Sequence, residues 1–403
     1  MIPKVFKYSI LSIVLIFPSL GSYCQLPEPT GPFAVSKVKM LIQDPERPEL
    51  YTEDPEDNRK VLLDVWYPTN SSAERIPYMH PEIQKVFLKD RKVADSVDSS
   101  LFYSATTHTS TAAKPDPRIS KAPTLIFSHG ASTPIEVYTT IFEDLASHGY
   151  IVFAIGHTYN TAALELPNGE IIKANRKYFD DRWTEDINRR WEAMMDFVKG
   201  EASAEVKLDT INTLFRSGFP ASLDMEIWRK DISLALDKME QLNKDRSSIF
   251  YRKLDLRKIG GFGHSYGGSA MGHALMKESR LQAAANLDGW QFGTRVPGKT
   301  FRKPFLYVRG GYPQPDALNS AVYSRGGKRF MQVKLAGTLH TNFGDLPLLT
   351  GPDNIFNTGT LEAERSTYVV NSLLRHFFDH TLKGMKSSWP LSTADFPELT
   401  YEH

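Results

Sequence analysis

A serine set among glycines is the residue of this chain with the clearest use in chemistry. Ser265 lies in Gly263-His264-Ser265-Tyr266-Gly267-Gly268, directly after the apolar run 258–262. A turn this tight holds the serine at a strained backbone conformation, and a Cβ on its neighbours would collide with it. A serine hydroxyl is a weak nucleophile and needs a base beside it. The motif therefore predicts a serine nucleophile; the alternative is a glycine-rich structural turn.

The base is found by its place along the chain. Where a Gly-x-Ser-x-Gly turn joins a strand to a helix, the order is nucleophile, acid, base. The histidines that follow Ser265 and an acid are His340, His376, His380 and His403. His376 and His380 are one turn apart on an expected helix, and His403 is terminal. His340 follows the expected strand 329–335, in a position where such sites are built, so we predict it as the base.

Two carboxylates could orient the imidazole of that base. Asp288 follows the expected strand 283–287, and Asp316 follows the expected strand 304–308 across a Gly/Pro-rich loop. The acid holds the tautomer of the imidazole and stabilises its protonated form. From the spacing alone, either loop could reach His340, and the choice stays open.

Backbone N–H groups are expected to form an oxyanion hole. One comes from Tyr266, the residue after the nucleophile, and the other from Ala131, in the turn after the expected strand 123–128. His129, just before that turn, is expected to make a structural hydrogen bond. No His-Glu-x-x-His or comparable ligand cluster occurs. We therefore expect no catalytic metal and no cofactor.

Alternating strands and helices must position these residues. Strands are expected at 33–42 and 61–68, as an antiparallel pair at the sheet edge, and then at 123–128 and 150–155. A helix around 81–88 and a Ser/Thr/Pro-rich loop form an excursion over 69–121, and a last helix over 361–383 ends at Gly384. Strands that alternate with helices indicate a mostly parallel sheet. The fold class is α/β, and specifically the α/β-hydrolase fold, with helices flanking the central sheet.

Residues 175–245 interrupt the alternation with helical, charged sequence that contains interspersed aromatic residues. A helical insertion between strands of this fold often forms a cap over the cleft. The alternative is that these helices only cover a face of the sheet.

The N-terminus has the layout of a secretory signal peptide. Lys4 and Lys7 precede an apolar stretch over 8–17 that is too short to span a bilayer comfortably, and small and polar residues follow up to Cys24. We expect residues 1–24 to be removed, which leaves 25–403 as one hydrolase domain in a secreted or periplasmic protein. The alternative is a lipid anchor on Cys24.

Composition limits the classes of partner. The 403 residues carry a formal net charge of +1, with 41% hydrophobic and 24% charged residues. This balance is that of a globular protein with ample core, and it gives no reason to expect nucleic acid as a partner. Cys24 is the only cysteine, so no intrachain disulfide is expected.

Four further motifs accompany the serine turn: Phe127-Ser128-His129-Gly130, the stretch 254–259, Leu287-Asp288-Gly289-Trp290 and His340-Thr341-Asn342-Phe343. Together they resemble the plasma-type platelet-activating factor acetylhydrolase family, from about Gly31 to about Glu398. The Gly-x-Ser-x-Gly turn, called the nucleophile elbow, is common to many hydrolases. Its combination with Leu-Asp-x-Trp and His-x-Asn-Phe is more specific.

The resemblance implies Asp288 as the acid. It also implies a calcium-independent esterase that removes short or oxidised acyl groups from phospholipids, with a small-molecule ester or phospholipid as partner and peripheral membrane contact left open. The chain departs from the family pattern directly after His129-Gly130. Ala-Ser-Thr-Pro stands at 131–134, where the family usually continues with Leu-Gly. Other hydrolases on the same machinery, such as a polyesterase or an exported peptidase, and a non-catalytic binding protein are the alternatives.

Several aromatic residues close to the expected catalytic residues are candidates to line the acyl pocket, with a core position as the alternative. They are Trp290, Phe292 and Phe343. His157 follows an expected strand end and is a further candidate to border the cleft.

Overall fold

The computed structural model describes residues 26–402 except 71–73, 95–104, 112, 294–300, 315, 325, 351–353 and 387–388. The predicted signal peptide at 1–24, including Cys24, lies outside the described residues. Among those described, no helix is both long and apolar enough to cross a membrane.

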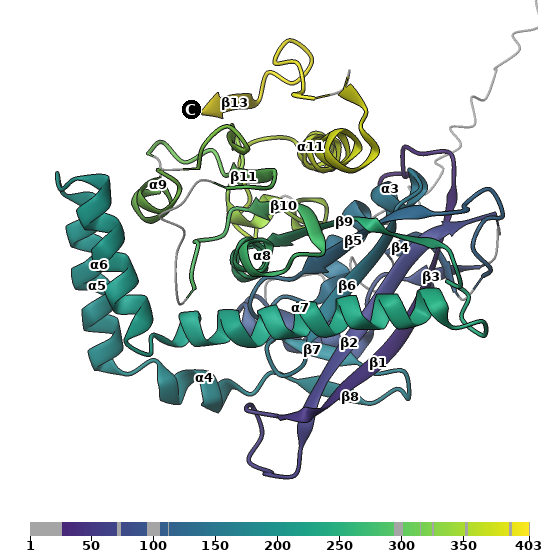
Figure 1. Ribbon diagram of the computed structural model, residues 1–403, viewed down its shortest axis with the longest axis horizontal. Coiled ribbons are helices and arrows are strands. Elements are labelled where there is room, and N and C mark those ends of the chain that lie inside the picture. Colours follow the sequence, from purple (N-terminus) through teal and green to yellow (C-terminus); the bar gives the residue numbers. More distant parts are fainter. Residues whose placement is uncertain are drawn as a thin grey trace, which may run out of the picture.

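A sheet of 11 strands organises the chain, in the order β13-β12-β11-β10-β9-β5-β6-β2-β1-β4-β3 (Figure 1). The run from β12 to β6 is parallel, β2 and β13 add to it antiparallel, and β1 pairs with β2 antiparallel. A mostly parallel sheet between helical layers confirms the predicted α/β-hydrolase fold. The strands are β1 (Ala34–Pro48), β2 (Asn58–Thr69), β3 (Arg75–Pro77), β4 (Thr106–Thr111), β5 (Ala122–Ser128), β6 (Ile151–His157), β9 (Leu254–His264), β10 (Leu281–Leu287), β11 (Phe305–Arg309), β12 (Phe330–Leu335) and β13 (Leu399–Glu402), and a separate hairpin pairs β7 (Ala163–Glu165) with β8 (Ile171–Lys173).

Helices cover both faces of this sheet. The α-helices are α1 (Pro81–Asp90), α3 (Thr139–Ser147), α4 (Arg176–Arg182), α5 (Glu185–Lys199), α6 (Ala204–Arg216), α7 (Pro220–Lys244), α8 (Tyr266–Lys277), α9 (Ala317–Tyr323), α10 (Leu346–Leu349) and α11 (Ala363–Lys383), and short 3₁₀ turns cover Ile135–Tyr138 and His340–Asn342. In Figure 1, α3 and α11 lie on one side of the sheet, and α7 and α8 lie on the other.

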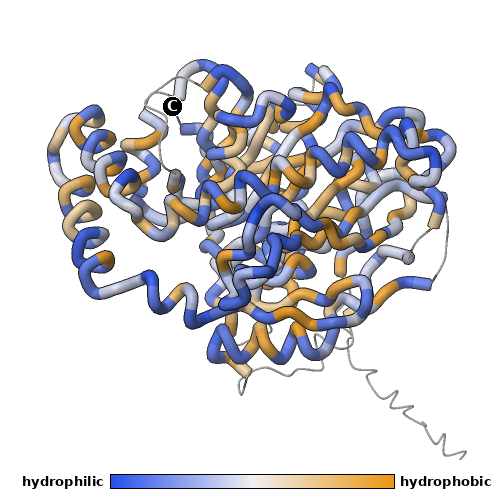
Figure 2. Tube along the Cα trace, turned by 60° about the horizontal axis from the view of Figure 1, so that its bottom comes forward, coloured by the Kyte–Doolittle hydropathy of each residue, from blue (hydrophilic) through white to orange (hydrophobic). Residues whose placement is uncertain are grey.

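The period of two along the strands gives each face its own core. Leu125 and Phe127 of β5 pack with the α3 and α11 side, whereas Ile126 between them packs with the α7 and α8 side. Successive side chains of a strand point to opposite faces, so a strand covered on both sides is apolar throughout. Figure 2 shows this, with orange segments along the central strands and alternating colours on the outer helices.

The sheet edge differs from the prediction. The antiparallel β1–β2 pair forms, but β1 also pairs in parallel with β4, and β3 pairs with β4. The excursion over 69–121 therefore extends the sheet beyond β1. The Ser/Thr-rich sequence of this segment gave no sign of β4, although three of its six polar side chains are buried.

Residues 175–245 form four helices with two different positions. The 25-residue α7 runs along one face of the sheet (Figure 1). Helices α5 and α6 form a hairpin beyond one end of α7 and contact α9. Side chains of α7 such as Trp228 and Ile232 are fully buried. This helix is therefore part of the core, and only the α5–α6 hairpin is placed to flank a cleft.

Candidate active site

The elbow at Ser265 has the strained geometry that its glycines predict. Ser265 lies between β9 and α8 with φ 55° and ψ −121°. A Cβ on Gly263 would lie 2.4 Å from the carbonyl carbon of Gly267, and one on Gly267 would lie 2.0 Å from the Ser128 oxygen. Both are far inside van der Waals contact. Glycine is required at these two positions because backbone passes directly over them.

Ser265, His340 and Asp288 form a continuous hydrogen-bonded series. The Ser265 hydroxyl donates to His340 Nε2 at 2.9 Å, and His340 Nδ1 donates to Asp288 Oδ2 at 2.7 Å. The other oxygen of Asp288 accepts the Gly310 N–H at 2.8 Å. Each side chain follows the carboxyl end of a strand, β9, β10 and β12 respectively for Ser265, Asp288 and His340. This arrangement can pass a proton from the serine to the imidazole.

The second candidate acid has another partner. Asp316 caps α9, because its Oδ1 accepts the N–H groups of Leu318 at 2.8 Å and Asn319 at 3.1 Å. Of the two carboxylates left open by the spacing, Asp288 is the one bonded to His340.

The two residues predicted to supply oxyanion-hole N–H groups differ in their surroundings. Tyr266 opens α8, where N–H groups have no partner within the helix. Among the described residues, the Ala131 N–H has no hydrogen-bond partner, whereas the flanking N–H groups of Gly130 and Ser132 bond to Tyr138 and Asn160. Both N–H groups are therefore available to a ligand.

A one-way hydrogen-bond relay joins the Ala131 turn to the loop of His340. His264 Nε2 contacts the His340 carbonyl oxygen at 2.9 Å, so this nitrogen must donate. His264 Nδ1 must then accept from the Tyr138 hydroxyl at 2.8 Å, and the Tyr138 oxygen accepts the Gly130 N–H at 3.1 Å. Burial lowers the pKa of His264 well below its usual value, which keeps it neutral. Sequence reasoning missed this relay.

A cavity of about 1000 Å³ opens beside the serine. It is lined by Met195, Lys199, Ser265, Tyr266, Asp288, Trp290, Phe292, Tyr307, Arg309, Tyr312, Gln314, Asp316, Ala317 and His340. Trp290 and Phe292, two of the predicted pocket residues, belong to this lining. Tyr312, which sequence reasoning did not single out, also accepts the His340 N–H at 2.8 Å.

Two predicted pocket residues are not part of this lining. Phe343 is fully buried in the core on the α3 and α11 side and stacks at 6.0 Å on His264. His157 is also fully buried, where it stacks at 3.8 Å on Trp228. Phe343 was predicted to line the pocket from its nearness to His340 in sequence, and His157 from its place at a strand end. Neither signal was sufficient, because both side chains point into the protein.

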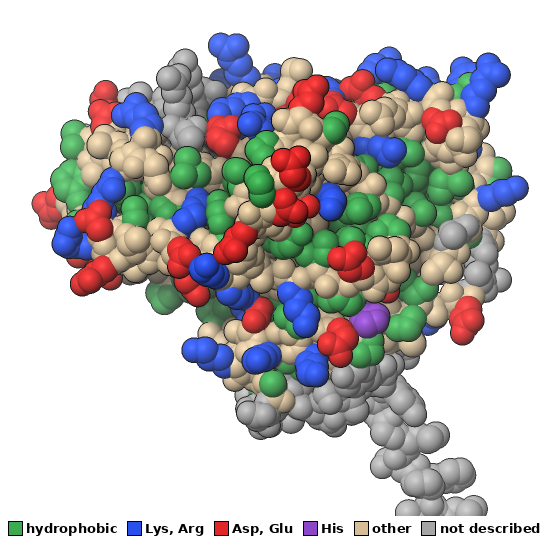
Figure 3. Space-filling view, turned by 90° about the horizontal axis from the view of Figure 1, so that it is seen from below, with side chains coloured by type: hydrophobic (Ala, Val, Ile, Leu, Met, Phe, Trp, Pro, Cys, Tyr) green, Lys and Arg blue, Asp and Glu red, His purple; other side chains and the backbone are tan. Residues whose placement is uncertain are grey.

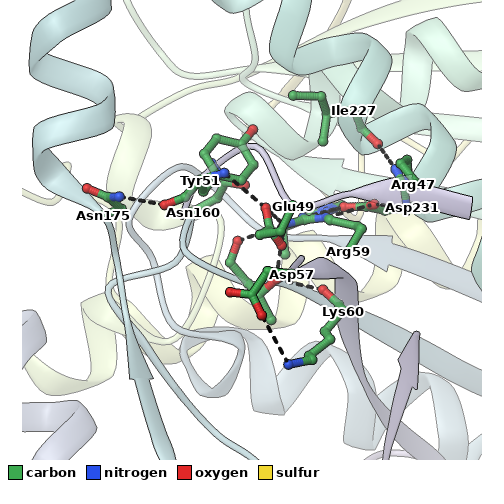
Figure 4. Close-up of polar contacts among 12 residues, drawn as sticks. Arg47, Glu49, Tyr51, Asp57, Arg59, Lys60, Asn160, Asn175, Ile227 and Asp231 are labelled. Carbon is green, nitrogen blue, oxygen red and sulfur yellow. Dashed lines mark hydrogen bonds and ion pairs between the residues drawn. The ribbon is translucent and has the colours of Figure 1, made fainter. Parts of the chain in front are cut away.

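His157 instead belongs to a buried charge cluster behind the elbow. Its Nδ1 donates to Asp231 at 2.8 Å and its Nε2 accepts from the Ser128 hydroxyl at 2.9 Å. Asp231 also pairs with Arg59 at 2.6 Å and with Arg47 at 2.7 Å. Figure 4 shows how Arg47, Arg59 and Asp231 converge. Burial lowers the pKa of His157 to about 4, so this histidine is neutral.

Within the described ranges, no group of three or more His, Cys, Asp or Glu side chains could hold a metal ion.

His129, one of the histidines near the serine, contacts the Gly130 carbonyl oxygen at 2.7 Å through Nδ1. Its Nε2 accepts the His157 N–H at 3.2 Å. This histidine therefore has the structural hydrogen bond that we predicted for it.

The sheet order and the elbow define an α/β-hydrolase. Comparison with protein families places the chain more narrowly. It belongs to the family described as platelet-activating factor acetylhydrolase, isoform II, whose model matches residues 20–383.

Individual relatives agree with this family. The chain is 28% identical over 244 residues to the platelet-activating factor acetylhydrolase of Canis lupus familiaris, covering 57% of this chain and 50% of that protein. It is 22% identical to a probable 1-alkyl-2-acetylglycerophosphocholine esterase of Arthroderma benhamiae, with 96% of each covered. The chain thus spans about half the length of the mammalian relative.

A solved structure shares the fold. The ferulic acid esterase from Streptomyces cinnamoneus superposes with a TM-score of 0.70 at 23% identity, over 94% of this chain and 99% of that one. At this identity the likeness concerns the fold alone.

Proposed function

We propose that this protein is a serine ester hydrolase that resembles platelet-activating factor acetylhydrolase and cleaves esters of short or oxidised acyl groups. The observation that carries the proposal is the Ser265–His340–Asp288 series at 2.9 Å and 2.7 Å, open to a cavity. Family membership supports ester hydrolysis, and relatives named for acetylhydrolase and phosphocholine esterase activity support the substrate class.

The mechanism follows from the roles of the three side chains. Ser265 attacks the ester carbonyl while His340 Nε2 takes its proton, and Asp288 holds the imidazole and stabilises its charged form. The N–H groups of Ala131 and Tyr266 bind the oxyanion. His340 then gives its proton to the alcohol oxygen as the ester C–O bond breaks. The alcohol departs, and the acyl group remains on Ser265 as an acyl-enzyme. Water activated by His340 releases the acid and restores Ser265.

Export and a cap complete the proposal. The order of charges, apolar stretch and small residues over 1–24 supports a signal peptide and a secreted protein. The α5–α6 hairpin is proposed as the cap, because Met195 and Lys199 of α5 line the cavity. The remaining helices of 175–245 belong to the scaffold.

Active-site labelling tests this function. We expect a fluorophosphonate to label the wild type but not Ser265→Ala, and p-nitrophenyl acetate hydrolysis to fall by several orders of magnitude in that variant. A matched control is Ser247→Ala, which removes an exposed serine that bonds only to the nearby Asp245. A folded wild type that is neither labelled nor active would contradict the proposal and favour a binding protein on this fold.

A further inference from the structure

The cavity beside Ser265 is much larger than an acetyl group requires. Its volume of about 1000 Å³ lies at the upper end of the range for sites that hold drug-sized ligands. Its walls include five aromatic residues: Tyr266, Trp290, Phe292, Tyr307 and Tyr312. A site with this lining suits a large group on the ester.

The aromatic walls form a corner with flat faces. The rings of Trp290 and Phe292 lie 6.4 Å apart at 82°. Trp191 of α5 packs behind both, at 5.4 Å from Trp290 and 5.8 Å from Phe292. This support keeps Trp290 in place although 43% of it is exposed. Aromatic faces held in this way favour a planar ring over a puckered one, because offset and edge-to-face ring contacts add to the burial of apolar area.

One polar wall offers a hydrogen-bond acceptor. Asp316 Oδ1 is occupied by the two N–H groups at the start of α9, whereas Oδ2 has no hydrogen bond to any other described residue. Asp316 is half-buried in the cavity wall, and burial raises its pKa to about 6. Because Oδ2 has no partner among the described residues and Asp316 lines the cavity, this oxygen is free to accept a hydrogen bond from a ligand there.

The charge of the lining does not favour a cationic ligand. Lys199 and Arg309 line the same cavity as Asp288 and Asp316, so positive and negative side chains are equal in number among the described lining residues. The Asp288 carboxylate is already bonded to His340. A neutral donor such as a hydroxyl group therefore fits Asp316 better than an ammonium group.

We propose that this cavity binds esters whose acyl group ends in a neutral hydroxyaryl ring, with the ring in the Trp290–Phe292 corner and the hydroxyl donating to Asp316. The inference rests on the proposed function, since the ring must reach the site as part of an ester that Ser265 attacks. It adds a substrate class to the short acyl esters proposed above.

Three methyl esters of matched length test the ring and the hydroxyl separately. They are 3-cyclohexylpropanoate, 3-phenylpropanoate and 3-(4-hydroxyphenyl)propanoate, and kcat/KM is measured for each. We expect the phenyl ester to exceed the cyclohexyl ester about fivefold, from ring contacts. The hydroxyphenyl ester should exceed the phenyl ester by about tenfold, from a hydrogen bond to a charged acceptor.

Two pairs of variants assign these preferences. Asp316→Ser should reduce the hydroxyl preference to near unity and leave the ring preference, because serine still caps α9 but lacks the second oxygen. Asp316→Asn should reduce the hydroxyl preference as well, because its one oxygen caps α9 and an NH2 group replaces the accepting Oδ2. Trp290→Ala should abolish the ring preference, and Trp290→Phe should retain it. Trp290 is partly exposed, so these variants are expected to fold.

Fluorophosphonate labelling and p-nitrophenyl acetate hydrolysis run beside these assays. Equal kcat/KM for the phenyl and cyclohexyl esters, in a protein that is labelled and cleaves the acetate, would overturn this inference alone. A hydroxyl preference that survives Asp316→Ser would overturn the role of Asp316. Absence of labelling in a folded protein would overturn the proposed function and this inference with it.

Discussion

At the scale of single residues, the relay from Gly130 through Tyr138 and His264 to His340 has only one consistent direction. A carbonyl oxygen at one end and a backbone N–H at the other leave no choice of donors. The relay ties the turn that carries the Ala131 N–H to the backbone of His340, the proposed base. Tyr138 and His264 therefore act as positioning residues, since neither is part of the cavity lining.

Tyr138→Phe should lower kcat for p-nitrophenyl acetate by about 10- to 100-fold with little change in KM, because an oxyanion-hole N–H acts mainly in the transition state. The variant leaves the Gly130 N–H without its acceptor and His264 without its donor. Affinity for an arylboronic acid, which mimics the tetrahedral intermediate, should fall in parallel with kcat.

The control for this variant is Tyr150→Phe. Tyr150 is also fully buried and donates to a side chain, Asp379, at 2.8 Å, but it is not part of the relay. It should lower stability without the parallel loss of kcat and boronic acid affinity. If the two variants behave alike, the relay has no positioning role.

The hydrogen-bonded pair Ser265 and His340 could be chosen from the sequence because motif and chain order constrain these two positions. The relay through Tyr138 and His264 could not be predicted from the sequence. Tyr138 and His264 are 126 positions apart, and nothing in their local sequence indicates that strand order brings them together. Phe343 and His157 show the converse, since a position near the site in sequence does not determine the direction of a side chain.

At the scale of elements, the buried charge cluster fastens α7 to β1, β2 and β6. Asp231 of α7 is fully buried between Arg47 of β1, Arg59 of β2 and His157 of β6. Arg59 has a second partner, Glu49, at 3.0 Å. Removing one member of a buried ionic group leaves the others without compensation. Sequence patterning gave α7 as helical but did not indicate which of its charges are buried.

Asp231→Ala should therefore destabilise the protein by about 3–5 kcal/mol, since Arg59, Arg47 and His157 all lose a partner. The free energy of unfolding is measured by urea titration. Asp186→Ala is the matched control, because Asp186 pairs with Arg189 on the surface of α5, with both side chains more than half exposed. It should change little. Equal effects of the two substitutions would show that the buried cluster does not anchor α7.

At the scale of the whole molecule, surface charges of both signs are interspersed, as the face in Figure 3 shows, in keeping with the net charge of +1. Buried groups rather than net charge are then expected to set the pH dependence of stability. Burial raises the pKa of Glu143 to about 8 and that of Asp345 to about 7. Both carboxyl groups lie near α3, where hydroxyl groups of Thr109, Thr140 and Tyr78 donate to them.

These two carboxyl groups bind protons more tightly in the folded protein than in the unfolded chain. Their contribution to stability is complete below the unfolded pKa values near 4 and is lost as pH rises through about 7 and about 8. Buried neutral histidines act in the opposite sense, since the lowered pKa of His129, about 3, and of His157, about 4, makes stability fall only below the unfolded value near 6.5. Above about pH 7.5 histidine is neutral in the unfolded chain as well, so there the effect of the carboxyl groups is not offset by these histidines.

The free energy of unfolding should accordingly decrease on the order of 1 kcal/mol between pH 7.5 and 9, from the release of protons by Glu143 and Asp345. Urea titrations at several pH values measure this slope. In the double variant Glu143→Gln, Asp345→Asn the slope should be close to flat, because neither amide titrates. A slope that persists unchanged in the double variant would assign it to other groups. Loss of stability in this window would mean that carboxyl groups packed against α3 set the alkaline limit of the folded protein.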